Sequence, residues 1–204
     1  MKRLFALFAL MAVAMLGTAA LADYADIHNE LQRKHMDSEC RVAPRLGYLF
    51  KNHCVGAANV VGVTNRVYTG SAITFDPVVK LGSATLVKST DYTQSFTNNT
   101  SVGKATVRIA ANRTGLFGSI DKTFEITPRP ISDATVSNIT TQVYTGSPVK
   151  PMPVVVFNGS TLSTNTDYIV SWENNVAASS NAVVVIHGKG NFGGEYRKTF
   201  TIAQ

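Results

Sequence analysis

The chain has 204 residues, of which 45% are hydrophobic and 16% charged, and its formal net charge is +6. That length is enough for two small domains. The basic surplus is spread along residues 58–130 without a cluster. This excludes the concentrated basic stripe that nucleic-acid binding needs, so we expect no nucleic-acid partner.

The chain opens with an export signal. Lys2 and Arg3 precede an uncharged apolar run over residues 4–16, and small residues then lead to Ala22. The run is shorter than the ~20 residues that a membrane-spanning helix needs. The pattern predicts a signal peptide, residues 1–22, cleaved after Ala22. We therefore expect a secreted protein, extracellular or at the cell surface, with no membrane insertion after cleavage.

The segment 23–57 differs from the rest of the chain. Tyr24, Ile27, Leu31 and His35 are spaced to share one helical face, with Asp23 as a possible cap. This predicts a short amphipathic helix around residues 24–38, followed by a loop. The segment is too small to be stable without a disulfide or packing on the first repeat.

The two cysteines, Cys40 and Cys54, both lie in this segment. Because exported proteins meet oxidising conditions, we expect a structural disulfide between them. A metal site with the nearby His35 and His53 is the alternative. No C-x-x-C or H-x-x-x-H spacing supports it, so the disulfide is favoured and no metal or cofactor is expected.

The pentapeptide VYTGS occurs at residues 67–71 and again at 143–147. Placing Val67 on Val143 aligns positions 67–126 with 143–202 without a gap, and 22 of the 60 positions are identical. The sequence thus predicts a first repeat, 58–126, and a second repeat, 134–204. The connector TPRPISD, residues 127–133, is short, and its prolines favour a stiff link. Repeats of this length indicate tandem modules.

Each repeat carries strand signals. Tyr92, Gln94 and Phe96 alternate with polar residues, and the same period of two recurs at the matching positions of the second repeat. Asn98 follows directly and Asn174 is its counterpart, and both suit a hairpin turn because asparagine tolerates positive φ. No stretch of either repeat has a helical apolar period. We expect an all-β fold made of small sandwiches.

The pattern YTGS…TDY…NN…GKGNFGG…KTFTI resembles bacterial immunoglobulin-like modules, which are strung in tandem in adhesins and other cell-surface proteins. The resemblance covers residues 58–126 and 134–202. The first repeat departs from it at residues 112–118, NRTGLFG. The resemblance implies two tandem immunoglobulin-like β-sandwich modules and a bacterial surface location. It implies little about activity, because such modules serve as spacers or binding platforms.

Catalytic signatures are missing from the sequence. Three of the four histidines, His28, His35 and His53, lie outside the repeats, and His187 has Ala111 as its counterpart. No G-x-S-x-G, H-E-x-x-H or P-loop motif occurs. We therefore expect no enzyme activity.

The residues that recur are interpreted as signatures of the fold. The repeat signature comprises Tyr68, Gly70, Asp91, Tyr92, Tyr144, Gly146, Asp167 and Tyr168. Aspartate at a strand start is expected to cap a turn, tyrosine to bury its ring, and glycine to permit a turn. Val67 and Val143 are expected to be half-buried. Phe96 and its counterpart Trp172 are expected to pack internally rather than stack on a sugar.

These patterns favour an exported, non-catalytic structural or adhesive protein at or near a bacterial cell surface. The alternatives are a subunit of an extracellular filament, in which residues 23–57 dock onto a neighbouring molecule, and a secreted glycan-binding module. The expected partners are a protein or glycan at a cell surface, or a further molecule of the same chain.

Overall fold

The computed structural model describes residues 53–204. The signal peptide, the helix expected around residues 24–38 and Cys40 lie outside the described residues. Within residues 53–204 the only helical elements are two 3-10 turns, η1 (Val55–Ala57) and η2 (Ile131–Asp133). The all-β prediction is confirmed for this part. No helix in it is long and apolar enough to cross a membrane.

The strand bounds recur at the spacing of the sequence repeat. Strands β2, β4, β5 and β7 begin at residues that the gapless alignment matches to the first residues of β10, β12, β13 and β16 respectively. The strands are β1 (Asn59–Val61), β2 (Arg66–Val67), β3 (Val78–Leu81), β4 (Ala84–Thr85), β5 (Tyr92–Thr97), β6 (Gly103–Ala111), β7 (Ser119–Thr127), β8 (Arg129–Pro130), β9 (Thr135–Val136), β10 (Gln142–Val143), β11 (Val155–Phe157), β12 (Ser160–Thr161), β13 (Tyr168–Glu173), β14 (Ser179–Gly188), β15 (Phe192–Gly193) and β16 (Glu195–Ala203).

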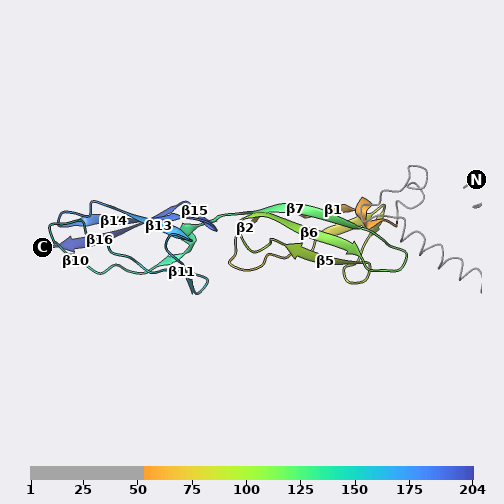
Figure 1. The fold of residues 1–204 in the computed structure, drawn as a ribbon, viewed down its shortest axis with the longest axis horizontal. Helices are drawn as coiled ribbons and strands as arrows, with labels where there is room; N and C mark the ends of the chain where they lie inside the picture. The colour runs from red at the N-terminus through yellow and green to blue at the C-terminus, as the bar shows by residue number, and fades with distance from the viewer. Residues whose placement is uncertain (1–52) are drawn as a thin grey trace, which may run out of the picture. The chain divides into compact units, whose positions relative to one another are not determined.

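The sheets repeat the same order. One four-stranded sheet has the order β2-β7-β6-β5, and the other has the order β10-β16-β14-β13 (Figure 1). Each is accompanied by a three-stranded sheet, β1-β3-β4 or β9-β11-β12, and β8 pairs with β15. The short strands β2 and β10 run parallel to β7 and β16, whereas β14 pairs antiparallel with β13 and β16.

The described residues form two compact units, whose limits differ from those of the sequence repeats. The smaller unit contains residues 53–62, Pro77–Ser95 and Val107–Lys122. The larger unit contains Val63–Asp76, Phe96–Thr106 and Thr123–Gln204. The larger unit therefore includes the whole second repeat together with the VYTGS segment of the first.

The core of the larger unit is built from both sheets of the second repeat. Strand alternation places Phe200 and Ile202 of β16 inward, where they meet Val184 and Ile186 of β14 and Val155 of β11. A smaller cluster around Phe124 and Ile126 belongs to the part of the first repeat in this unit. In the smaller unit, Val79, Leu81, Val107 and Ile109 are buried.

Cys54 is buried in the smaller unit, and its carbonyl oxygen accepts a hydrogen bond of 3.0 Å from the amide of Ala57. Its expected partner Cys40 is not among the described residues, so the disulfide stays a prediction.

Candidate functional site

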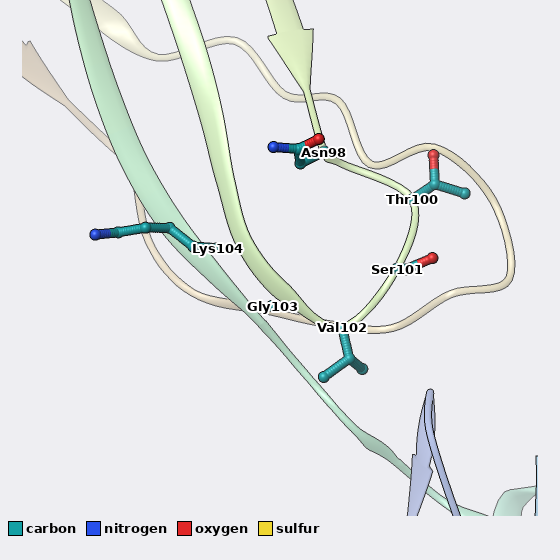
Figure 2. A pocket seen from close by; sticks show the side chains of 6 residues that line it. All are labelled: Asn98, Thr100, Ser101, Val102, Gly103 and Lys104. Atoms are coloured by element: carbon teal, nitrogen blue, oxygen red, sulfur yellow. The ribbon is translucent and has the colours of Figure 1, made fainter.

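A hollow lies where β5 leads through a turn into β6. Its volume is about 220 Å³. Figure 2 shows its six lining residues, which come from the turn and from the first two residues of β6: Asn98, Thr100, Ser101, Val102, Gly103 and Lys104. Binding sites for small molecules usually measure ~300–1,000 Å³ and draw polar groups from several elements. The hollow is therefore a poor candidate for a ligand site.

The recurring Asp-Tyr pairs hold turns, as expected. An Asp91 carboxylate oxygen accepts a 2.8 Å hydrogen bond from the amide of Val87, and Asp167 does the same with the amide of Ser163. The rings of Tyr92 and Tyr168 are buried. The second carboxylate oxygen of Asp91 lies 2.7 Å from Arg113. Both carboxylates thus stabilise turns of the fold.

The paired aromatic positions also pack internally. Phe96 makes edge-to-face contacts with Phe75 and Phe124, with ring centroids 5.3 and 6.5 Å away. Trp172 packs on the core of the second repeat, and its indole N–H donates a 2.9 Å hydrogen bond to the carbonyl of Pro151. These contacts agree with the packing interpretation and leave less of each ring available for a sugar.

The two VYTGS turns share one backbone design. Gly70 and Gly146 both have positive φ, at +83° and +75°. The hydroxyls of Thr69 and Thr145 donate to the carbonyls of Ser71 and Ser147, at 3.1 and 3.3 Å. The threonine hydroxyl therefore closes each turn locally.

The burial of the valine and tyrosine side chains in the two turns differs from expectation. Val67 and Val143 are exposed instead of half-buried, because β2 and β10 are two-residue strands at sheet edges. Tyr68 is half-buried, whereas the Tyr144 ring is exposed. The same pentapeptide thus lies in two different environments.

Tyr68 forms an aromatic joint inside the larger unit. Its ring lies edge-on to Phe192, with centroids 5.5 Å apart, and stacks at 6.4 Å on Phe157. Phe157 and Phe192 themselves meet edge to face at 5.3 Å. Tyr68 packs against the core of the second repeat and also against the Phe124 cluster. A single side chain of the first repeat therefore links two apolar clusters.

Hydrogen bonds to the backbone of Tyr68 and Thr69 accompany these ring contacts. The Arg129 Nε donates a 2.9 Å hydrogen bond to the carbonyl of Tyr68, and the Asn158 amide donates one of 2.9 Å to the carbonyl of Thr69. The amide of Val102 donates to Asn191 Oδ1 at 2.8 Å. The Arg129 guanidinium also lies over the Phe157 ring, 5.5 Å from its centroid. We call Phe157, Phe192, Arg129 and Asn158 the seat of Tyr68.

A second arrangement has the residue types of a hydrolase triad. Ser171 Oγ lies 3.0 Å from His187 Nε2, and His187 Nδ1 lies 3.6 Å from Glu195 Oε2. These residues stand on β13, β14 and β16, so only the sheet register brings them together. No local sequence motif contains all three residues, so the sequence alone did not predict their proximity.

Two side chains of this arrangement are in contact with water. The side chains of His187 and Glu195 are 38% and 50% exposed, so water screens their interaction. Glu195 also faces Arg197, whose pKa is raised above its ordinary value mainly by the hydrogen bond that it donates to Glu173. The hollow between β5 and β6 is not lined by Ser171, so it does not supply the water-excluding surroundings that catalysis at this hydroxyl would need.

We expect Ser171→Ala to leave ester hydrolysis by the purified protein at its background rate. The reason is that the side chains of His187 and Glu195 are 38% and 50% exposed, so water weakens the interactions that would activate the Ser171 hydroxyl. Hydrolysis of a chromogenic acetyl ester at neutral pH measures this, with His187→Ala as a second variant. A loss of about 100-fold or more in either variant would show a working nucleophile.

No protein-family model matches the chain, and neither a curated protein nor a solved structure shows significant similarity to it. Among residues 53–204, no group of three or more His, Cys, Asp or Glu side chains could hold a metal ion.

The joint at Tyr68 is the most developed arrangement of polar and aromatic contacts described above. The sequence signal for it is the recurrence of VYTGS, although recurrence alone does not reveal what the ring touches.

The two turn glycines permit a matched stability test. We expect Gly146→Val to cost roughly 1–3 kcal/mol, because a β-branched residue is strained at positive φ. Gly70→Val should cost more, since a Cβ there would lie 3.4 Å from Phe157 Cε1, whereas nothing lies within 4 Å at Gly146. Urea denaturation of the full chain measures both. Equal losses of stability in the two variants would mean that Phe157 can shift without cost to accommodate a side chain at residue 70.

Proposed function

We propose that this protein is an exported, non-catalytic structural or adhesive protein that acts at or near a bacterial cell surface. In this proposal, two tandem immunoglobulin-like β-sandwich modules form its body. The observation that carries the proposal is the aromatic joint, in which Tyr68 of the first repeat occupies a seat made by the second repeat and the connector.

The joint supports a structural role because it uses the recurring motif to hold one repeat to the next. Three side chain–backbone hydrogen bonds and two ring contacts hold this part of the first repeat to the second repeat and to Arg129 of the connector. Contacts of this kind restrict the freedom of a linked module, so less ordering entropy is lost when the protein holds a partner. A protein that presents a binding face at a fixed distance from its attachment benefits from that restriction.

The chemistry of the described surface favours binding over catalysis. The recurring carboxylates cap turns, and the His187 and Glu195 side chains of the Ser171–His187–Glu195 set are 38% and 50% exposed to solvent. The glycan-binding alternative is weakened because Phe96 and Trp172 are half-buried and engaged in internal contacts. Adhesion through a protein surface is therefore the better supported form of the proposal.

A filament subunit is the second candidate. It is favoured by one observation, the exposure of Tyr144, which repeats the sequence and turn of the docked Tyr68. A surface that is docked in one repeat and open in the other is what an assembling subunit requires.

The proposal is tested in the producing bacterium. A strain lacking this chain is complemented with the wild type, with Tyr68→Ala or with the exposed control Thr201→Ala. We expect protease shaving of intact cells to release the wild-type protein, and attachment of the strain to coated surfaces to depend on it. Tyr68→Ala should restore attachment less well than Thr201→Ala. Retention in the cytoplasm, or attachment unaffected by the deletion, would contradict the proposal.

A further inference from the structure

The seat of Tyr68 contains the one Asn-Gly pair of the chain. Asn158 and Gly159 form the two-residue turn between β11 and β12. Both have positive φ, at 48° and 79°, as a type I′ hairpin turn requires. From this turn the Asn158 side-chain amide donates its 2.9 Å hydrogen bond to the carbonyl of Thr69. The turn is therefore part of the second repeat and part of the joint.

An asparagine that precedes a glycine can react with its own backbone. The glycine nitrogen attacks the asparagine side-chain carbon Cγ, a five-membered ring closes with loss of ammonia, and water opens the ring to aspartate or isoaspartate. A side chain on the following residue obstructs the attack, and glycine has none. Every other asparagine of the chain is followed by a residue with a side chain. The sequence therefore singles out Asn158 for this reaction.

The surroundings of the turn leave the reaction unobstructed. Asn158 and Gly159 are both exposed, so water reaches them. In the part of the chain that the structure describes, the Gly159 amide donates no hydrogen bond, which leaves its nitrogen available for attack. A Cβ added to Gly159 would meet no atom within 4 Å beyond its chain neighbours. The ring therefore has room to form.

The joint restrains the reacting side chain. The nitrogen of Asn158 that would leave as ammonia is the one that donates to the Thr69 carbonyl, so the reaction has to break this hydrogen bond. Thr69 is kept in place because the neighbouring Tyr68 ring packs on Phe157 and Phe192. The docked joint thus disfavours the loss of ammonia, and an open joint removes that restraint.

We propose that the Asn158-Gly159 pair is a site of spontaneous deamidation that the docked Tyr68 turn restrains, and that its product prevents the turn from docking fully again. The bond from the Gly159 nitrogen to Cγ forms while the bond from Cγ to Nδ2 breaks, and the proton of the attacking nitrogen leaves with the ammonia. Water then supplies the new carboxyl oxygen and returns a proton to the backbone nitrogen. This inference goes beyond the proposed function and does not depend on where the protein acts.

The product lacks the donor that the joint uses. A carboxylate at position 158 only accepts hydrogen bonds, so it cannot replace the bond to the Thr69 carbonyl oxygen. Arg129, the cation of the seat, is already paired with Asp133. Isoaspartate also adds one carbon to the backbone of a two-residue turn, which disturbs the pairing of Phe157 with Ser160. Either product weakens the joint irreversibly.

Peptide mapping by mass spectrometry tests the site on the purified full chain, incubated at mildly alkaline pH. In Tyr68→Ala, and in wild type unfolded in guanidinium chloride, position 158 should convert faster than any other asparagine. Folded Tyr68→Ala should convert about tenfold or more faster than folded wild type, because reaction through an open joint follows the population of the open form. Tyr144→Ala is the matched control, because its ring is exposed, and it should convert like the wild type.

Three results would overturn the inference. They are preferential conversion of another asparagine in Tyr68→Ala, equal conversion rates in folded Tyr68→Ala and wild type, and a Tyr68→Phe variant that converts as fast as Tyr68→Ala although it keeps the ring. Circular dichroism checks that each folded sample retains its β spectrum. None of these results affects surface location or attachment, so they leave the proposed function to its own test.

The effect of the product is measured directly with Asn158→Asp, which carries the aspartate from the start. Hydrogen exchange at the Arg129 amide, which donates to the Asn191 carbonyl, should be about tenfold faster than in wild type, because one hydrogen bond of the joint is lost. Asn181→Asp is the control, since Asn181 is exposed and its side chain makes no hydrogen bond within residues 53–204. Wild-type exchange in Asn158→Asp would show that deamidation does not loosen the joint.

Discussion

Replacing Phe200 by alanine is expected to lower the free energy of unfolding by about 3–5 kcal/mol. Phe200 lies on β16 in the middle of the core of the larger unit, where it packs among Ile186, Val184 and Ile202. Removing its ring deletes apolar contacts from both sheets and leaves a cavity that their paired strands cannot close. A loss of this size is a large part of the ~5–15 kcal/mol that holds a domain folded.

Trp172 provides the measurement, because it is the only tryptophan and packs against the same core. Urea unfolding followed by tryptophan fluorescence should have a much lower midpoint in Phe200→Ala. Thr201→Ala, at an exposed neighbouring position on β16, should change stability by no more than about 0.5 kcal/mol. Equal midpoints for the two variants would mean that the Phe200 ring is not part of the stable core.

The sequence was most informative where local chemistry decides the structure. Asn98 and Asn174 were expected in turns, and both have positive φ, at 55° and 53°. The side chains of Asn99 and Asn175 then donate to the carbonyls of Ile73 and Val149, which are themselves counterparts in the two repeats. Turn residues are predictable because their backbone and hydrogen-bonding preferences act within a few positions.

The burial and the contacts of the VYTGS side chains could not be predicted in the same way. The pentapeptide VYTGS contains no information on what lies beyond the end of its repeat. The Tyr68 ring packs against the seat that contains Phe157, whereas the Tyr144 ring is exposed and has no such neighbour among the described residues. The exposure of Val143 has a related cause, since β10 is short and lies at an edge of its sheet, which strand propensity does not specify.

The other contacts that could not be predicted from the sequence depend on the register of the sheets. Ser171 and His187 are distant in the chain, and they meet because Ile169 pairs with His187 across β13 and β14. The parallel pairing of β2 with β7 joins residues from opposite ends of the first repeat, such as Arg66 and Ile126. Pairings of this kind depend on the whole sheet and leave no local pattern.

Tyr68→Ala is expected to destabilise the larger unit by about 2–4 kcal/mol. The ring is only half-buried, so its loss should cost somewhat less than that of a fully buried phenylalanine. It also removes both aromatic contacts with Phe157 and Phe192, each of which contributes ~0.5–1.5 kcal/mol beyond area burial. Tyr68→Phe keeps the ring and should retain most of this stability.

Tyr144→Ala is the matched control, since it makes the same substitution in the same pentapeptide at an exposed site. Its cost in dilute monomer should stay below about 1 kcal/mol. Hydrogen exchange locates the effect: in Tyr68→Ala, the amides of Arg129 and Val102, which both donate to Asn191, should exchange faster, whereas in Tyr144→Ala they should exchange at the wild-type rate. Equal stability losses in the two alanine variants, with unchanged exchange at Arg129, would refute the joint. The two tyrosines would then serve only their own turns, and the seat formed by Phe157 and Phe192 would have no role in holding one repeat to the next.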